Sequence, residues 1–270
     1  MINVVLATGN LAGIAVWLVP SEPESALLEQ LMSRHPKPST PHSFPHFHPH
    51  ITLAAIGVTP HQPSPPPAAA AATSTHDQGT DPHPHPNMDT DPDPTMLLAL
   101  REAVPLGQRA VHVRFARVLA GDHYFRSIYV AIAPSSELAQ LRVALALAQK
   151  AQRGQKGPTG PDSPPAFPHL SLYYVADEEA HTRERFLQEL EREEVVRHSA
   201  DGLSVALRCA GDGGGGGGGG GGGVEDEGGP GSGSGNDGWL EGCTCTQIWI
   251  VDCGGPVEGW KVLDKILLAK

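Results

Sequence analysis

The sequence has few cysteines, a shortage of basic residues and no long apolar run, and each shortage excludes a class of protein. Four cysteines in 270 residues are too few for a disulfide-stabilised scaffold of this length. Lys and Arg number 19 against 30 Asp and Glu, and this net charge of −11 argues against a surface that coats long nucleic acid. The apolar stretch from Met1 to Pro20 lacks the basic start of a signal peptide and is too short to span a bilayer. We therefore expect no membrane span, and the cytoplasm as the default location.

The cysteines cluster near the end of the chain, and we weighed them as metal ligands. Cys243, Cys245 and Cys253 offer three thiols, but their spacing is not that of a zinc ribbon or finger. Reduced cysteines on or near a strand are the simpler interpretation, shared by Cys209. We expect no metal site and no cofactor.

Glycine and proline, 32 and 26 residues, are concentrated in a few low-complexity runs. These runs predict disordered inserts at about 58–95, 153–165 and 211–238, the last with eleven consecutive glycines. The remainder, roughly 200 residues, has the size of one ordinary domain, which we place at 13–270. We expect it to be a monomer.

Outside the inserts, the hydrophobic pattern predicts strands and helices in the order β-α-β, insert, β-β-α, β-α-β-β. Each half of the chain thus carries a similar order of elements. The predicted helices are at 21–34, 96–104, 135–152 and 177–194. The predicted strands are at 14–19, 50–57, 110–120, 124–133, 169–175, 203–209 and 246–251, and 260–268 is a strand or a helix.

Two short stretches, one in each half, match each other. Both read Pro-His-aliphatic-hydroxyl-Leu, at Pro49 to Leu53 and at Pro168 to Leu172. Side chains alternate across a strand, so a histidine and a hydroxyl residue two positions apart share one face. If the two strands lie side by side, two imidazoles and two hydroxyls meet at one cleft.

This set of groups suits the hydrolysis of a phosphodiester. One imidazole can take a proton from water and the other can protonate the leaving oxygen, because both forms of histidine are accessible near neutrality. The hydroxyls of Thr52 and Ser171 can donate hydrogen bonds to the phosphoryl oxygens. We therefore predict His50 and His169 as the acid–base pair, without assigning which of them is the base.

The paired His-x-Thr and His-x-Ser motifs resemble those of the two-histidine (2H) phosphoesterase superfamily, and within it the chain looks like the cyclic phosphodiesterases of fungi and plants. The resemblance extends to Trp17 in the first strand, to Tyr174 just after the second motif, and to the ending at 249–251 and 255–261. It covers the ordered segments and not the inserts. It implies that Trp17 and Tyr174 join Thr52 and Ser171 in binding the substrate.

What the resemblance implies is an α+β fold with two quasi-symmetric lobes. Each lobe would carry a mostly antiparallel sheet backed by helices, with the cleft between them. The implied reaction needs no metal and opens nucleoside 2′,3′-cyclic phosphates to 2′-phosphates. ADP-ribose cyclic phosphate, formed downstream of tRNA splicing and opened to ADP-ribose 1″-phosphate, is the implied biological substrate. Fungal relatives also imply an association with the Golgi.

Several alternatives stay open from the sequence. One alternative on the same fold is an RNA-end processing enzyme of 2′,5′ ligase or exonuclease type. Another is a protein that binds a nucleotide or an RNA end without catalysis. Trp17 is either core or a platform for a base, and Tyr124 and Arg126 are further candidates for the cleft wall. The histidines at positions 42, 46 and 48 suggest a metal, but the prolines between them predict no fixed ligand geometry.

Overall fold

The architecture was analysed in a computed structural model, which describes residues 13–37, 40, 42–56, 94–153, 168–209 and 238–270. The predicted inserts lie almost entirely outside these residues. Four α-helices are present in the described part: α1 (Glu22–Met32), α2 (Pro94–Ala103), α3 (Ser136–Arg153) and α4 (Arg183–Arg192). The strands are β1 (Ile14–Pro20), β2 (Ile51–Ile56), β3 (Val111–Ala120), β4 (Ile128–Ile132), β5 (His169–Tyr173), β6 (Val196–His198), β7 (Val205–Arg208), β8 (Trp239–Leu240), β9 (Gly242–Asp252) and β10 (Lys261–Leu267).

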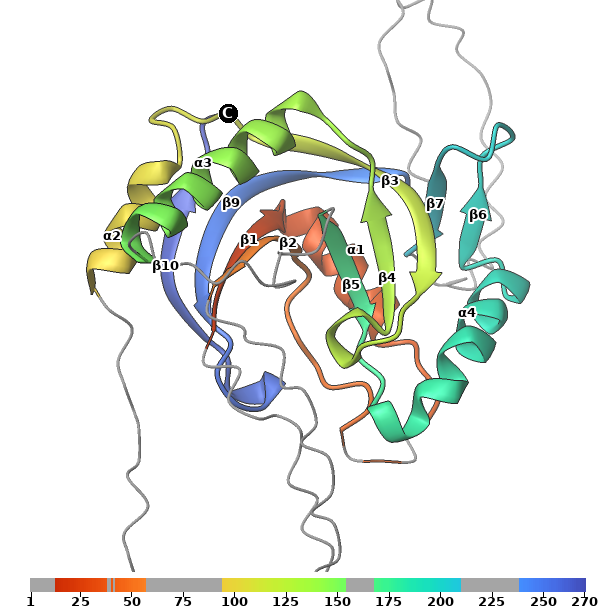
Figure 1. Cartoon of the computed structure of the whole chain (residues 1–270). Coiled ribbons are helices and arrows are strands. Elements are labelled where there is room, and N and C mark those ends of the chain that lie inside the picture. The colour runs from red at the N-terminus through yellow and green to blue at the C-terminus, as the bar shows by residue number, and fades with distance from the viewer. Residues whose placement is uncertain (1–12, 38–39, 41, 57–93, 154–167, 210–237) are drawn as a thin grey trace, which may run out of the picture.

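Seven of these strands form one antiparallel sheet in the order β1-β2-β5-β4-β3-β9-β10. A further pairing between β1 and β9 closes the order, so the strands curve around a ring, as Figure 1 shows. The remaining strands, β6, β7 and β8, form a small sheet of their own. The α+β class with an antiparallel sheet and helices is confirmed. The pairing of β2 with β5 makes the sheet continuous between the two motif-bearing strands.

The helices pack on the sheet through regularly spaced apolar side chains. Leu138, Leu141 and Leu145 lie on one side of α3 and are all at most 2% exposed, as their spacing predicts. The helices α2 and α3 lie together along one side of the ring, and α4 lies near β3 and β4 on another (Figure 1). The large apolar cluster under these helices also contains the side chains of the seven-stranded sheet that face the helices. The other face of the sheet is left for polar and aromatic groups.

Several predicted elements differ in detail from the structure. The expected strand 124–133 begins with a 3-10 turn, η1 (Tyr124–Arg126), and only Ile128–Ile132 joins the sheet. The expected helix 177–194 likewise begins as a 3-10 turn, η2 (Asp177–Thr182), before α4. The segment 260–268 is a strand, because Lys261–Leu267 pairs with β9. The short strands β6 and β8 were not predicted, since two or three residues show no clear alternation.

The described residues also test the expectations about cysteines and membrane spans. Cys209, Cys243 and Cys245 are fully buried and reduced, as the simpler interpretation expected. Within the described ranges, no cluster of three or more Cys, His, Asp or Glu side chains is arranged to hold a metal ion. In the same ranges no helix is long and apolar enough to cross a membrane.

Candidate active site

The two motifs meet directly, because β2 and β5 are neighbouring antiparallel strands. In their register Ile51 lies opposite Leu170, and Thr52 lies opposite His169. Directly opposite residues of an antiparallel pair point to the same face, and residues two apart on one strand do so too. His50, Thr52, His169 and Ser171 therefore form a square on one face. Ile51 and Leu170 lie between them, point into the core and are fully buried.

The square has approximate two-fold symmetry about the Ile51–Leu170 pair. Each imidazole lies opposite a hydroxyl residue of the other strand, and the two imidazoles occupy diagonal corners. A group bound at the centre of the square is thus flanked by an imidazole on each side. This is the arrangement that the alternation of the two motifs predicted if the strands were adjacent.

The imidazole of His50 is held in one orientation by a backbone carbonyl. Its Nδ1 lies 2.7 Å from the carbonyl oxygen of His48. A carbonyl oxygen only accepts, so Nδ1 carries the proton and donates, and Nε2 of the neutral ring is an acceptor. Burial is the main cause that lowers the pKa of His50 to about 3; the nearby His169 and His48 rings contribute in the same direction, and the bond to the His48 carbonyl acts against them. His50 is therefore neutral near pH 7, with an acceptor nitrogen available for a proton.

His169 lies in the middle of the sheet rather than at an edge. It is 4% exposed and is flanked by Thr52 on β2 and Ala131 on β4. The ring of Tyr129 approaches it edge-on, with 5.7 Å between the ring centroids. Because both neighbouring strands pair with β5, the backbone on which this imidazole is mounted is fixed on both sides.

The two hydroxyls of the square differ in their surroundings. Ser171 is 1% exposed, and its Oγ lies 3.1 Å from the carbonyl oxygen of Phe125, to which it donates. The Tyr174 hydroxyl lies close enough to Ser171 for that side chain to lower its pKa against the larger effect of burial. Thr52 is more exposed than the other three residues of the square. The square therefore has one hydroxyl engaged by the protein and one that is more open.

A β-bulge in β5 decides where Tyr174 lies. Tyr129 pairs with Ser171 and the preceding residue, Ile128, pairs with Tyr173, so Leu172 is an extra residue in β5. The extra residue reverses the alternation, which turns Tyr173 toward the core. There the Tyr173 hydroxyl lies 2.9 Å from the carbonyl oxygens of Leu31 and Arg34. Tyr174 is thereby placed beside Ser171, and burial raises its pKa.

Aromatic rings surround the square, and several of them were not singled out from the sequence. Phe47 stacks on Tyr174 with 4.2 Å between centroids and meets His50 edge-on at 5.8 Å. Trp260 lies 6.0 Å from Tyr174 and 6.5 Å from His50. Phe47 follows a proline- and histidine-rich segment and Trp260 follows a short turn, so neither is part of a strand pattern that marks a site.

Trp17 lies against His50. Their rings are stacked face to face, with 3.6 Å between centroids and 12° between planes. The tryptophan is 4% exposed, and Trp260 approaches it at 5.6 Å in a tilted orientation. One face of the indole is thus occupied by the imidazole.

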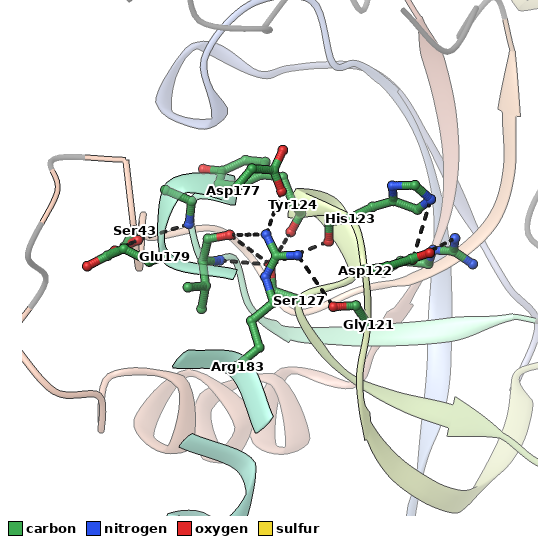
Figure 2. A network of polar contacts seen from close by, with 12 residues as sticks. Ser43, Gly121, Asp122, His123, Tyr124, Ser127, Asp177, Glu179 and Arg183 are labelled. Atoms are coloured by element: carbon green, nitrogen blue, oxygen red, sulfur yellow. Dashed lines mark hydrogen bonds and ion pairs between the residues drawn. The ribbon is translucent and has the colours of Figure 1, made fainter. Parts of the chain in front are cut away.

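A polar network behind the site holds the segments that carry its aromatic wall (Figure 2). Arg183, the first residue of α4, is 2% exposed and donates to the carbonyl oxygen of Val175 at 2.7 Å and to that of Gly121 at 3.4 Å. It also donates to Asp177 at 2.6 Å. Ser127 accepts from the amide of Val175 at 2.9 Å and donates to the carbonyl oxygen of Tyr124 at 2.6 Å.

The network therefore ties the turn that contains Phe125 to the segment that follows Tyr174. Ser43 and Glu179 extend it, since the Ser43 hydroxyl accepts from the amide of Ala176 at 2.9 Å and contacts the Glu179 carboxylate. Figure 2 shows the guanidinium group of Arg183 at the centre of these contacts. From the sequence, Arg183 was only one charge in a charged helix.

The remaining candidates from the sequence are Tyr124, Arg126 and His48. Tyr124 is half-buried, donates to the carbonyl oxygen of His42 at 2.9 Å and lies 5.4 Å from Tyr174 between ring centroids, so it belongs to the wall. The guanidinium of Arg126 is 3.9 Å from the Asp122 carboxylate, in an exposed ion pair. His48 stacks on Trp249 with 4.6 Å between centroids, and its Nδ1 lies 3.0 Å from Glu29.

Comparisons with known proteins give one family match and two structural likenesses. A family model described as "cyclic phosphodiesterase-like protein" matches residues 12–268. A search of curated proteins gives no match. Among solved structures, the chain is similar to one titled "Crystal structure of phosphoesterase", with 11% identity, a TM-score of 0.43, and 96% of this chain and 99% of that chain covered. It is also similar to E. coli LigT complexed with 3′-AMP, with 12% identity, a TM-score of 0.40, and coverages of 95% and 98%.

Proposed function

Because the chain belongs to the cyclic phosphodiesterase-like protein family, we propose that it hydrolyses nucleoside 2′,3′-cyclic phosphates to 2′-phosphates at the His50–His169 square. The observation that carries the proposal is the β2–β5 register, which brings two imidazoles and two hydroxyls to one face. In this proposal these four residues carry out the proton transfers and hold the phosphoryl oxygens.

His50 is the general base in this proposal. Its Nδ1 is committed to the carbonyl oxygen of His48, and its lowered pKa keeps the ring neutral. Nε2 takes a proton from a water molecule, and the water oxygen forms a bond to phosphorus. The bond between phosphorus and the 3′ oxygen breaks, and His169 gives its proton to that oxygen. The diagonal positions of the imidazoles suit an in-line displacement, in which the attacking and leaving oxygens are on opposite sides of phosphorus.

The hydroxyls of Thr52 and Ser171 hold the non-bridging phosphoryl oxygens in the proposal. Hydrogen-bond donors fixed on strands stabilise the charge that develops on these oxygens in the transition state. Thr52 is open enough to reach a substrate directly. Ser171 exchanges its bond to the Phe125 carbonyl for one to the phosphate by rotating its hydroxyl, while Tyr174 stays beside it.

The finer proposal, that ADP-ribose cyclic phosphate is the preferred substrate, is supported by a cation further along the same face. In the sheet register Thr52 lies opposite Trp17, Trp17 opposite Trp249, and Trp249 opposite Lys265. Three strand spacings of about 4.8 Å separate Lys265 from the motif strand, or about 14 Å. The Lys265 ammonium lies 4.1 Å from the Trp249 ring centroid. A substrate that carries a diphosphate beside its cyclic phosphate can meet this charge, whereas a simple nucleoside cyclic phosphate cannot.

The alternatives differ from this proposal in what they require of the site. Binding of an RNA end without catalysis does not require two facing imidazoles, one of them held as a neutral acceptor. Processing of long RNA requires a basic surface, and the net charge of −11 does not favour one.

One assay tests the proposal. The protein is incubated, with excess chelator, with ADP-ribose cyclic phosphate and the four nucleoside 2′,3′-cyclic phosphates, and the products are identified. We expect the 3′ ester of the nucleoside substrates to open and to leave 2′-phosphates. Binding of 2′-phosphates without turnover of any cyclic phosphate would favour the non-catalytic alternative, and activity lost to the chelator and restored by zinc would favour a metal enzyme.

A further inference from the structure

Among the residues that the structure describes, no carboxylate acts on His50 to stabilise its protonated form. The ionisable groups that act on His50 are His169 on β5 and His48 just before β2, and each opposes a second positive charge. In the described residues no acidic side chain is among the groups that shift its pKa. Hydrolases that use a histidine base commonly stabilise the imidazolium with a buried aspartate. Here other groups must stabilise it.

In the described part of the chain, two contacts lie closest to the imidazole, whereas Phe47 and Trp260 meet it only edge-on, at 5.8 and 6.5 Å between ring centroids. The first is the hydrogen bond from Nδ1 to the carbonyl oxygen of His48. The second is the indole of Trp17, whose plane lies 12° from that of the imidazole at a centroid distance of 3.6 Å. The negative face of an indole attracts a cation over its centre, and this attraction is strongest where water is excluded. Trp17 and His50 are both almost completely buried.

The indole is itself held rigidly. Trp17 is in β1, which pairs with β2 on one side and with β9 on the other, opposite Thr52 and Trp249. Trp260 lies 5.6 Å away and packs beside it. With 4% of its surface exposed and one face on the imidazole, Trp17 is not a free platform for a nucleobase.

We propose that Trp17 is a positioning residue for His50, whose indole face orients the imidazole and stabilises the imidazolium that forms when His50 takes the proton from water. This role rests on the proposed function and differs from the substrate-binding role that the family resemblance implies. The contribution appears mainly in the transition state, because the imidazole is neutral beforehand. Loss of the indole face therefore lowers kcat and leaves KM nearly unchanged.

Two substitutions that leave side chains of similar volume separate the effect of an aromatic face from that of apolar packing. Trp17→Phe keeps an aromatic face, and Trp17→Leu keeps an apolar side chain without one. With adenosine 2′,3′-cyclic phosphate we expect kcat to fall about 10- to 30-fold in Trp17→Leu, the size of a desolvated cation–π contact, and clearly less in Trp17→Phe. Trp239→Leu removes a tryptophan that lies over Arg197 in the small sheet and is the matched control. Equal losses of kcat in the two Trp17 variants would overturn the proposal.

Fluorination tests the same point without changing the shape of the residue. Fluorotryptophans weaken the negative face of the indole progressively, and the protein has four tryptophans. We expect kcat and the NMR-measured pKa of His50 to fall with each added fluorine in the wild type and to stay constant in the Trp17→Phe background. Constant values in the wild type, or the same decline in both backgrounds, would overturn the role of Trp17. The NMR titration needs no substrate, so it also separates this proposal from failure of the proposed reaction.

Discussion

Thr52 lies directly opposite His169 across the β2–β5 pair. This one pairing places the hydroxyl of the first motif beside the imidazole of the second, and by the same register it places Ser171 opposite His50. A shift of the register by one residue would turn one motif into the core. The register is fixed by Ile51 and Leu170, which are fully buried on the other face.

The hydroxyl of Thr52 is expected to contribute to the transition state. Thr52→Val removes the donor and keeps the shape, and we expect kcat to fall about 100-fold, as when one donor to a developing oxyanion is lost. Thr52→Ser keeps the hydroxyl and should stay within about 5-fold of the wild type. Steady-state kinetics with adenosine 2′,3′-cyclic phosphate measure both, and a Thr52→Val enzyme with wild-type kcat would remove Thr52 from the mechanism.

Stability should depend on pH through His50. In the unfolded chain His50 binds a proton near pH 6.5, whereas burial keeps it neutral in the folded state down to about pH 3. Between these values the unfolded state binds more protons, so the free energy of unfolding decreases as the pH falls, by up to about 1.4 kcal/mol per pH unit.

The matched control is His50→Asn, whose amide nitrogen can still donate to the His48 carbonyl while nothing titrates. Urea unfolding at several pH values between 4 and 7 should show a shallower decline in His50→Asn than in the wild type. Identical pH dependence in the two proteins would show that His50 is not neutral in the folded state.

Arg183 is expected to support both stability and catalysis. Arg183→Met leaves the carbonyl oxygens of Val175 and Gly121 without their charged donor, and we expect the free energy of unfolding to fall by about 2 kcal/mol or more. Because these carbonyls belong to the segments around Tyr174 and Phe125, kcat should also fall, by about 10-fold. Arg183→Lys keeps one charged donor and should lie between the two. A fall in stability with full activity in Arg183→Met would show that the network does not position the site.

Lys265 is expected to discriminate between substrates. Lys265→Met should raise KM for ADP-ribose cyclic phosphate about 5- to 10-fold, the range of a modest charge contact, and leave KM for adenosine 2′,3′-cyclic phosphate unchanged. Lys265→Arg keeps the charge and is the control. An equal change for both substrates would argue against a contact between Lys265 and the diphosphate.

Much of the site follows from local patterns in the sequence. Alternation alone places His50 with Thr52 and His169 with Ser171, because these pairs depend only on positions within one strand. That the two strands are neighbours, in this register, depends on long-range pairing that no local pattern shows. Only the likeness of the two motifs hinted at it.

Other parts of the site could not be foreseen for identifiable reasons. The side to which Tyr174 points depends on the extra residue Leu172, and a bulge has no signal in an apolar strand. Arg183 is in a helix whose other charges are exposed, so burial distinguishes it and sequence does not. Phe47 is brought to Tyr174 by the path of a segment without regular structure.

The turnover of adenosine 2′,3′-cyclic phosphate by wild type, His50→Ala, His169→Ala and the double variant tests the central claim most directly. ³¹P NMR identifies the ester that is opened. The account predicts adenosine 2′-phosphate from the wild type and a loss of about 1,000-fold or more in kcat for each single variant, because each removes one of two required proton transfers. It also predicts a double variant little worse than either single one. Near-normal turnover in either single variant would contradict the account.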